Sequence, residues 1–299
     1  MNSTIKKLLW PIIKIKNAYE NYLCRTNPEK LFAFRFRRVT GEKLNIDTPV
    51  TLYDKIAHLA FRTDTSRWSV LADKIGVRDF IAEKGYGDNL PKLLGVWDNA
   101  DKIDYSKLPK QFVLKTNNAS ATNIIVNDKD LLNKEATNKQ LNEWLAYDYG
   151  LYTCQPHYSR IKPLILAEEL LIDDETTGKG KSLNDYKFFC INGEPTYVMT
   201  MTDREFNTHN VNVMVFDLKW QAHPEFISNR QDSNANVERP VCFDKMIEIA
   251  KVLSAEFEFV RVDFYNINNT PIFGELTFTP GFSIPSKKFL QELGEKLKI

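Results

Sequence analysis

The segment 259–278 constrains the fold most, because both of its arms alternate between apolar and other side chains. Apolar residues at 260, 262 and 264 alternate with Arg261, Asp263 and Tyr265. A period of two is typical of a strand with one buried face. Only an odd loop length keeps the apolar residues of both arms on the same face. We therefore expect a three-residue loop, 268–270, which places Asp263 opposite Glu275 and the apolar pair 262 and 276 opposite each other.

Two carboxylates that face each other across a strand pair repel unless a positive charge lies between them. A hard divalent cation meets this need, and Mg²⁺ in proteins commonly takes one or two carboxylates together with substrate phosphates. Arg261 lies on the same face as Asp263 and is suited to contact such phosphates. The alternative from the pattern alone is a solvent-facing side on which the acids pair with Arg261 and nearby lysines.

The rest of the chain mixes a second hairpin with helices. Asn192-Gly193 separates two β-rich runs and predicts a two-residue turn. Short strands are expected at 90–97, 112–115, 123–126 and 164–171, and helices over 51–84, 133–149, 243–256 and 285–297. This mixture indicates the α+β class, with neither an alternating parallel sheet nor a helical bundle.

Charge and motif content exclude several classes of protein. The chain of 299 residues has 40 Lys and Arg against 39 Asp and Glu, a net charge of +1, which disfavours broad nucleic-acid binding. Its 4 cysteines lie far apart without ligand spacing, so we expect no structural zinc and a cytoplasmic protein with reduced thiols. No phosphate-binding GxxxxGK[ST] loop, no GxSxG elbow and no membrane-spanning run is found.

The N-terminal segment is basic and has no acidic residue before Glu20. Four lysines surround six apolar residues there, which predicts a weak interfacial anchor, residues 1–20, at the anionic inner face of a membrane. The alternative is a helix that docks its apolar side on the body of the protein. Pro11 argues against one uninterrupted helix.

The order of the motifs resembles the ATP-grasp superfamily. FVLK (112–115), a small-residue loop, NIIV (123–126), AEELL (167–171), DYKFF (185–189) and VRVDFYN…FGELTFTPG (260–281) occur in turn. More closely, residues 50–299 are similar to the TupA-like branch, often encoded with teichuronopeptide, capsule or O-antigen genes. The resemblance implies two α+β subdomains that clasp ATP. The expected parts are a basic helical segment 1–50, an N-terminal subdomain 51–111, a central subdomain 112–172 and a C-terminal subdomain 173–299 with the metal hairpin.

The same resemblance implies the roles of individual residues. Nucleotide contacts are expected from Lys74, Lys115, Ser120 and Lys187, and a hinge that reads adenine and ribose from Glu168, Glu169, Leu170 and Leu171. Asp263, Glu275 and Thr277 are expected to hold Mg²⁺. Lys187, Arg204 and Arg261 are expected to contact the phosphates during phosphoryl transfer, which needs positioning and charge neutralisation more than a protein nucleophile.

The chain departs from the family pattern at two places. The loop between FVLK and NIIV is usually glycine-rich, whereas here it reads NNASATN over 117–123. Glycine lets backbone amides approach phosphate closely. Either the loop binds through Ser120, Thr122 and asparagine side chains, or ATP turnover is weakened. In addition, Thr277 stands where many family members have asparagine.

The expected function is an ATP-dependent carboxylate–amine ligase acting on small molecules. The acid is expected to be a uronic-acid sugar or sugar nucleotide of a surface polysaccharide, and the amine an amino acid or small amine. Two alternatives stay open. Asp128-Lys129-Asp130 after a strand could be the DxD metal motif of a glycosyltransferase, although Asp128 could equally cap the following turn. A non-catalytic relative that has lost turnover is the second alternative.

Overall fold

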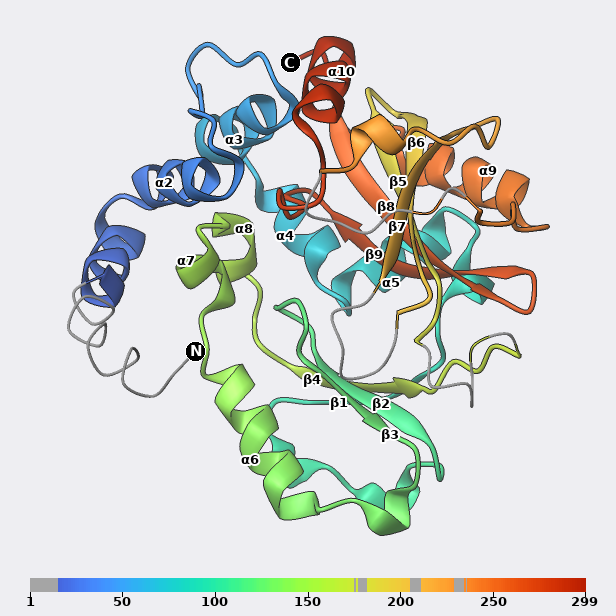
Figure 1. The fold of residues 1–299 in the computed structure, drawn as a ribbon. Helices are drawn as coiled ribbons and strands as arrows, with labels where there is room; N and C mark the ends of the chain where they lie inside the picture. Colours follow the sequence, from blue (N-terminus) through green and yellow to red (C-terminus); the bar gives the residue numbers. More distant parts are fainter. Residues whose placement is uncertain (1–15, 175, 177–181, 205–210, 229–233, 235) are drawn as a thin grey trace, which may run out of the picture.

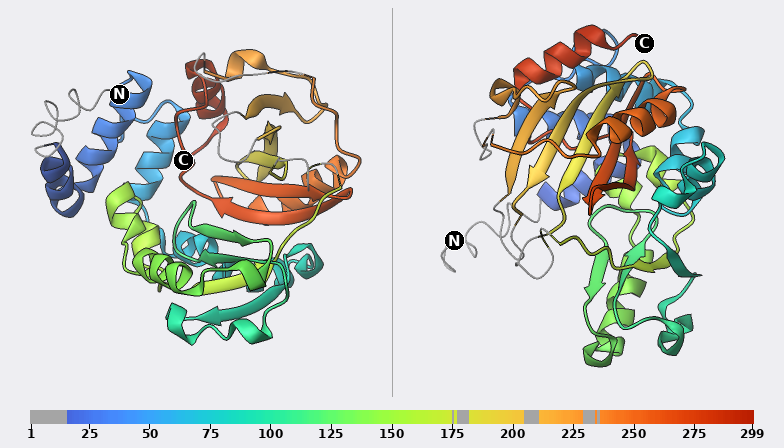
Figure 2. Two further views of the ribbon diagram at one scale, coloured as in Figure 1. Left: turned by 60° about the horizontal axis from the view of Figure 1, so that its bottom comes forward. Right: turned by 90° about the vertical axis from the view of Figure 1, so that its right-hand side faces the viewer.

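The computed structural model describes residues 16–174, 176, 182–204, 211–228, 234 and 236–299. The expected membrane anchor therefore lies largely outside the described residues. The described chain forms two antiparallel sheets, which lie apart in the lower and upper parts of Figure 1 and in the right-hand view of Figure 2. Helices accompany both sheets, as expected for the α+β class.

The expected strands and helices occur in the expected order, but the stretch 51–84 divides into three helices, and the strand over 212–217 was not predicted. After a helix over residues 16–26 come α2 (Pro28–Thr40), α3 (Leu52–Arg62), α4 (Ser66–Ala72), α5 (Gly76–Glu83), η1 (Gly87–Asn89), β1 (Leu93–Trp97), η2 (Ala100–Lys102), η3 (Tyr105–Lys107), β2 (Phe112–Thr116), β3 (Asn123–Val126), η4 (Lys129–Leu131), α6 (Lys134–Leu145), α7 (Tyr149–Thr153), α8 (Pro156–Ser159) and β4 (Ile165–Glu169). The second half comprises β5 (Asp185–Ile191), β6 (Glu194–Thr202), β7 (Asn212–Asp217), η5 (Pro224–Phe226), α9 (Phe243–Ser254), β8 (Phe259–Ile267), β9 (Thr270–Thr277) and α10 (Lys287–Lys296).

The four-stranded sheet has the order β1-β4-β2-β3. Leu114 of β2 and Ala167 of β4 are fully buried and pack with Leu141 of α6 in one apolar cluster. The expected boundary at residue 111 falls between β1 and β2, two strands of this sheet. The subdomain boundaries remain predictions.

The five-stranded sheet has the order β7-β6-β5-β8-β9 and carries helices on both faces. Phe188 packs with Phe243 of α9, and its neighbour Phe189 packs with Phe289 of α10. Because successive side chains of a strand point to opposite faces, the sheet lies between two apolar clusters. It is therefore a rigid support for side chains along β5, β8 and β9.

The predicted two-residue turn between β5 and β6 is confirmed. Asn192 and Gly193 have φ of 50° and 81°, the left-handed values that a type I′ hairpin turn requires at both central positions.

The β8–β9 hairpin reaches the predicted pairing by a different route. Asp263 does lie opposite Glu275, but Ile267 pairs with Thr270, so the turn has two residues and the expected three-residue loop was wrong. A bulge between residues 263 and 264, where Gly274 is the extra residue, supplies the odd residue instead. An added Cβ at Gly274 would lie 3.1 Å from the carbonyl oxygen of Asp263, so glycine suits this close approach.

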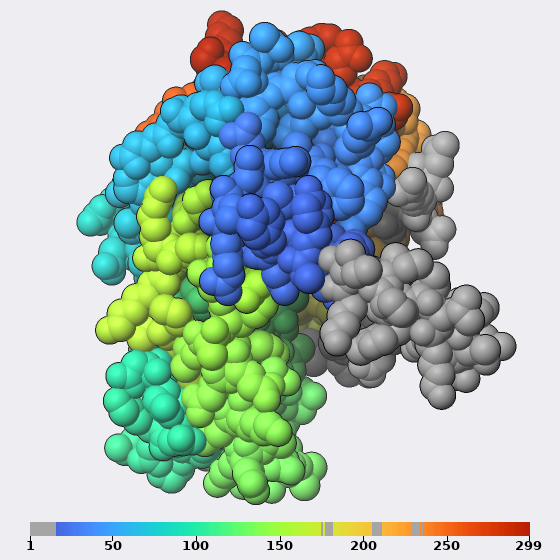
Figure 3. All heavy atoms as spheres, turned by 90° about the vertical axis from the view of Figure 1, so that its left-hand side faces the viewer, coloured from blue at the N-terminus to red at the C-terminus, as the bar shows by residue number. Residues whose placement is uncertain are grey.

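The N-terminal helices pack on the body of the protein. Phe32 and Phe36 of α2 are buried and belong to the apolar cluster on the α10 face of the sheet, whereas Phe34 between them is 46% exposed. Figure 3 shows these helices against the segment around residues 150–160. α2 is therefore docked on the body of the protein. Among the described residues, no helix is long and apolar enough to cross a membrane.

Candidate active site

Four predicted site residues meet on the β8–β9 hairpin and are called here the hairpin cluster: Arg261, Asp263, Glu275 and Thr277. Arg261 donates from Nε to Asp263 Oδ1 at 2.7 Å and from Nη2 to Asp263 Oδ2 at 2.6 Å. The same Nη2 lies 3.1 Å from Glu275 Oε1 and 3.1 Å from Thr277 Oγ1. The guanidinium therefore supplies the positive charge that the facing acids need.

The acids pair with Arg261 and Lys187, as the alternative from the pattern expected, but the cluster is largely buried and does not face solvent. Asp263 is 2% exposed, whereas the side chain of Glu275 is 35% exposed. Burial alone would raise the pKa of Asp263, but Arg261 and Lys187 outweigh it and hold this pKa below its ordinary value. Asp263 is consequently ionised and already paired, and Glu275 is the more accessible acid.

Lys187 extends the cluster onto β5. It lies opposite Asp263 in the strand register, with its Nζ 2.8 Å from Asp263 Oδ2 and 3.3 Å from Asp185 Oδ1. Burial opposes the charge of this lysine, but the two carboxylates raise its pKa above the ordinary value. Arg204, with a side chain 41% exposed, lies farther out and reaches Asp185 Oδ2 at 3.4 Å.

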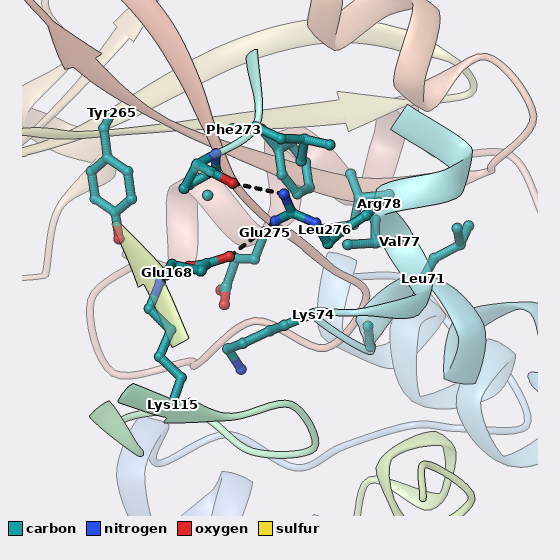
Figure 4. A pocket seen from close by; sticks show the side chains of 14 residues that line it. Leu71, Lys74, Val77, Arg78, Lys115, Glu168, Tyr265, Phe273, Glu275 and Leu276 are labelled. Atoms are coloured by element: carbon teal, nitrogen blue, oxygen red, sulfur yellow. Dashed lines mark hydrogen bonds and ion pairs between the residues drawn. The ribbon is translucent and has the colours of Figure 1, made fainter. Parts of the chain in front are cut away.

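A second group of charges centres on Glu168 of β4. Lys115 of β2 lies 2.6 Å from Glu168 Oε2, and Arg78 of α5 lies 3.1 Å from Oε1. Figure 4 shows these three side chains around one space, with Lys74 and Glu275 beside it. The sequence therefore brings a carboxylate and three cations from separate elements to the same place.

Lys74 lies in a turn before α5, within the stretch 51–84 that was expected to be helical. The turn is fixed by the buried Asn117, which donates to Asp73 Oδ1 at 2.8 Å and accepts from the amide of Leu164 at 2.7 Å. Lys74 donates to the carbonyl of Ala119, and burial lowers its pKa. The loop after β2 is thus tied directly to the lysine expected to contact nucleotide.

Other predicted nucleotide residues lie away from this space. Glu169 points to the opposite side of β4 from Glu168 and accepts from the amide of Lys92 at 2.8 Å. Leu170 and Leu171 follow β4 and are partly buried. Ser120 lies on the other side of the hairpin cluster.

Two cavities adjoin Glu275. The first, about 20 Å³, is lined by Lys74, Arg78, Lys115, Glu168 and Glu275, among others. It is large enough for about one water molecule, so a larger ligand needs its ion pairs to move apart. The second, about 320 Å³, is lined by Arg261, Glu275 and Thr277 together with residues of α2, α7 and the 279–282 segment. Glu275 forms a wall of both cavities.

Three residues of this region were missed by the sequence reasoning. Arg78 follows Lys74 by four positions, but Lys74 precedes α5, so helical spacing does not explain why both side chains reach the same space. Asp185 precedes Lys187 by two positions and so shares its strand face. Asn117 carries no such periodic signal, because its partners are distant in sequence.

The structure supports the capping alternative for Asp128. Its side chain accepts from the amide of Asp130 at 3.0 Å and caps η4. Asp128 also pairs with Lys110 at 3.2 Å.

The hairpin cluster contains oxygen donors of the kind that hard cations take in proteins. Asp263 and Glu275 supply carboxylate oxygens and Thr277 a hydroxyl, which is the oxygen donor set that Mg²⁺ prefers. Within the described residues no group of three or more His, Cys, Asp or Glu side chains could hold a metal. The protein side of such a site is therefore partial, as Mg²⁺ sites on nucleotides commonly are.

Comparison with solved structures finds ATP-grasp enzymes of low identity. The ATP-grasp ligase PsnB complexed with its minimal precursor is 11% identical, with a TM-score of 0.42 over 79% of this chain and 62% of that chain. D-alanine–D-alanine ligase from Bacillus anthracis is 12% identical, with a TM-score of 0.44 over 76% and 67%. L-amino acid ligase from Bacillus licheniformis is 12% identical, with a TM-score of 0.44 over 77% and 47%. The chain thus spans less than two thirds of the PsnB ligase.

Comparison with curated proteins finds no match. The family model of the TupA-like ATP-grasp proteins matches residues 54–298, most of the chain. This match confirms the resemblance drawn from the order of the motifs. The chain belongs to the TupA-like ATP-grasp family.

Proposed function

We propose that the protein is an ATP- and Mg²⁺-dependent carboxylate–amine ligase. The observation that carries this proposal is the meeting of two charged groups at a single cavity. Lys74, Lys115 and Glu168 contribute from one side, and Glu275 of the hairpin cluster contributes from the other. Cations around a cavity between two sheets suit a polyphosphate, and acids beside them suit its divalent cation.

The proposed reaction has two steps. A carboxylate oxygen of the acceptor attacks the γ-phosphorus of ATP, and ADP leaves with the bridging oxygen. The amine nitrogen then attacks the acyl carbon, inorganic phosphate leaves, and the nitrogen loses a proton. Arg261 and Lys187 offset negative charge on the transferring group, with Arg204 at the outer edge.

Asp263, Glu275 and Thr277 are the residues proposed to hold Mg²⁺, which when bound neutralises phosphate charge. Glu275 is the principal ligand in this proposal, because its side chain is partly exposed and faces the cavity. Both oxygens of Asp263 already accept from Arg261, and one also accepts from Lys187. Asp263 therefore also holds the two cations in place.

The proposed nucleotide contacts include residues of three kinds. Lys74 and Lys115 are proposed to reach phosphates after Lys115 exchanges its ion pair with Glu168. Ser120 is proposed as a contact from the loop after β2. Glu168, Glu169, Leu170 and Leu171 are proposed to form the hinge beside adenine and ribose.

The proposed acid is a uronic-acid sugar of a bacterial capsule or O-antigen, and the amine an amino acid or small amine. We also propose a cytoplasmic protein that associates through residues 1–20 with the anionic inner face of the membrane. The described end of this segment exposes Tyr19 by 47%, and Tyr22 just after the segment is 61% exposed. Sedimentation with anionic liposomes tests this association, and equal binding with and without residues 1–20 would contradict it.

The ligase is tested by incubating the protein with Mg·ATP, uronic-acid nucleotides and pooled amines. We expect ADP and phosphate release that requires both the acid and the amine. Asp263→Asn and Glu275→Gln should each abolish this release, whereas Asp128→Asn, the matched control away from the cavity, should retain it. If instead the protein consumes sugar nucleotide without ATP, and Asp128→Asn loses this consumption, the protein is a glycosyltransferase.

A further inference from the structure

The larger cavity joins the hairpin cluster to a helix outside the matched family region. Arg261, Glu275 and Thr277 line one side of it, and Phe32 and Arg35 of α2 line another. The family match begins at residue 54, so α2 lies outside the matched region. This helix nevertheless forms part of a cavity that touches the reacting end of the proposed site.

α2 is held firmly in this position. Phe32 contacts Phe282 with ring centroids 6.0 Å apart, and Phe36 contacts the same ring at 5.4 Å. Arg35 donates to the carbonyl of Tyr152 and to Glu20 Oε2 at 2.8 Å. The wall is therefore packed on both the segment after β9 and the segment around α7.

The lining combines aromatic rings with neutral hydrogen-bonding groups. Phe32, Phe282 and Tyr149 supply rings, while Gln155 and Thr279 supply polar atoms and bond to each other. The Tyr149 hydroxyl interacts with Gln155 and Ser120, which orients it. At about 320 Å³ the cavity is at the lower end of the range of small-molecule sites, roughly 300–1,000 Å³.

The charges of the lining favour an anion without an amino group. Among the described lining residues Glu275 is the sole carboxylate, and its Oε1 accepts from Arg261 and Thr277. An α-amino acid would bring its ammonium group to this one carboxylate beside the Arg261 guanidinium, where the two positive charges repel. A sugar ring packs its C–H face on aromatic rings and offers hydroxyls to neutral polar groups.

We propose that this cavity binds the acceptor as a single sugar ring bearing a carboxylate, and that α2 determines its specificity through Phe32. The carboxylate lies toward Arg261 and the ring lies against the aromatic lining. This inference rests on the proposed function, of which it names the acceptor site and the helix that selects the substrate.

The test measures binding without turnover, by calorimetry on the full chain. The probes are D-glucuronate, D-glucose and D-alanine. We expect glucuronate to bind at least about tenfold more tightly than either other probe. Phe32→Trp should weaken glucuronate binding by about tenfold, because the larger ring enters the cavity. Phe34→Trp, on the exposed side of the same helix, is the matched control and should bind like the wild type.

Affinity for a fluorescent ATP analogue is measured on the same proteins and separates the two proposals. Two results would overturn this inference but not the proposed function. The first is nucleotide binding without preference for glucuronate, and the second is equal glucuronate affinity in Phe32→Trp and Phe34→Trp. Absence of nucleotide binding would overturn the proposed function. If Phe32→Trp does not fold, Tyr149→Leu on α7 is the second variant. We expect Tyr149→Leu to bind glucuronate more weakly than the wild type. Unchanged glucuronate binding in this variant would contradict the inference.

Discussion

Arg261 and Asp263, two residues apart on β8, form a two-point ion pair in which Nε lies 2.7 Å from Oδ1 and Nη2 lies 2.6 Å from Oδ2. Because Nη2 also reaches Glu275, one guanidinium offsets two carboxylates that face each other across the hairpin. The pair therefore holds together a site whose acids would otherwise repel.

Removal of this guanidinium should destabilise the protein. In Arg261→Met, the buried Asp263 keeps only Lys187 as a cationic partner. Loss of one member of a buried ion pair costs about 3–5 kcal/mol, and we expect a fall of this size in the free energy of unfolding, measured with urea. Arg62→Met is the control, because it removes only exposed ion pairs, to Glu29 and Asp47. We expect this variant to unfold at the same urea concentration as the wild type. If Arg261→Met unfolds at the same urea concentration as the wild type, the ion pair makes no net contribution to the free energy of unfolding.

The loop after β2 should gain stability from a glycine. Ala121 has φ of 60°, a left-handed conformation that costs a residue with a Cβ roughly 1–2 kcal/mol. We expect Ala121→Gly to raise the free energy of unfolding by about 1 kcal/mol after the entropy cost of glycine. Ala119→Gly in the same loop, where φ is negative and the side chain is 2% exposed, should lower it. Equal effects of the two changes would argue against strain at Ala121.

The bulge in β9 predicts a cost at Gly274. The Cβ of an alanine there would lie 3.1 Å from the carbonyl oxygen of Asp263, so the two strands must separate slightly. We expect Gly274→Ala to lower the free energy of unfolding by about 1 kcal/mol, and so to lower the melting temperature. It should also reduce ATP-dependent activity, because Asp263 and Glu275 shift. Gly281→Ala, where no atom lies within 4 Å of the added Cβ, should leave the melting temperature unchanged. Unaltered melting of Gly274→Ala would mean that the strands accommodate the methyl group.

His157 predicts a pH dependence of stability. Its ring is fully buried against Trp68 and Tyr158, and burial lowers its pKa from 6.5 to about 3. Because the unfolded chain binds the proton more readily, folding loses stability as pH falls from about 6.5 toward 3, by up to about 1.4 kcal/mol per pH unit. Urea unfolding of His157→Leu should lack this part of the slope, whereas His223→Gln should retain it. A slope in His157→Leu equal to that of the wild type would assign the acid sensitivity to other groups.

The pairing of Asp263 with Glu275 could be predicted, because the apolar residues of both arms must share the buried face. The position of the extra residue could not, since a loop and a bulge satisfy the same alternation. The contact of Lys187 with Asp263 depends on β5 lying next to β8, although residues 192–258 separate these strands in the sequence, and local periodicity carries no information about such neighbours. The same holds for Glu168, whose partners Arg78 and Lys115 come from two other elements.

Glu275 forms a wall of both cavities, and this links their occupants thermodynamically. A ligand that turns the Glu275 side chain toward one cavity changes the shape and charge of the other. The affinity change that the first ligand imposes on the second must equal the change that the second imposes on the first. One carboxylate on the β8–β9 hairpin is therefore common to both spaces, and it is the side chain through which two bound ligands would affect each other.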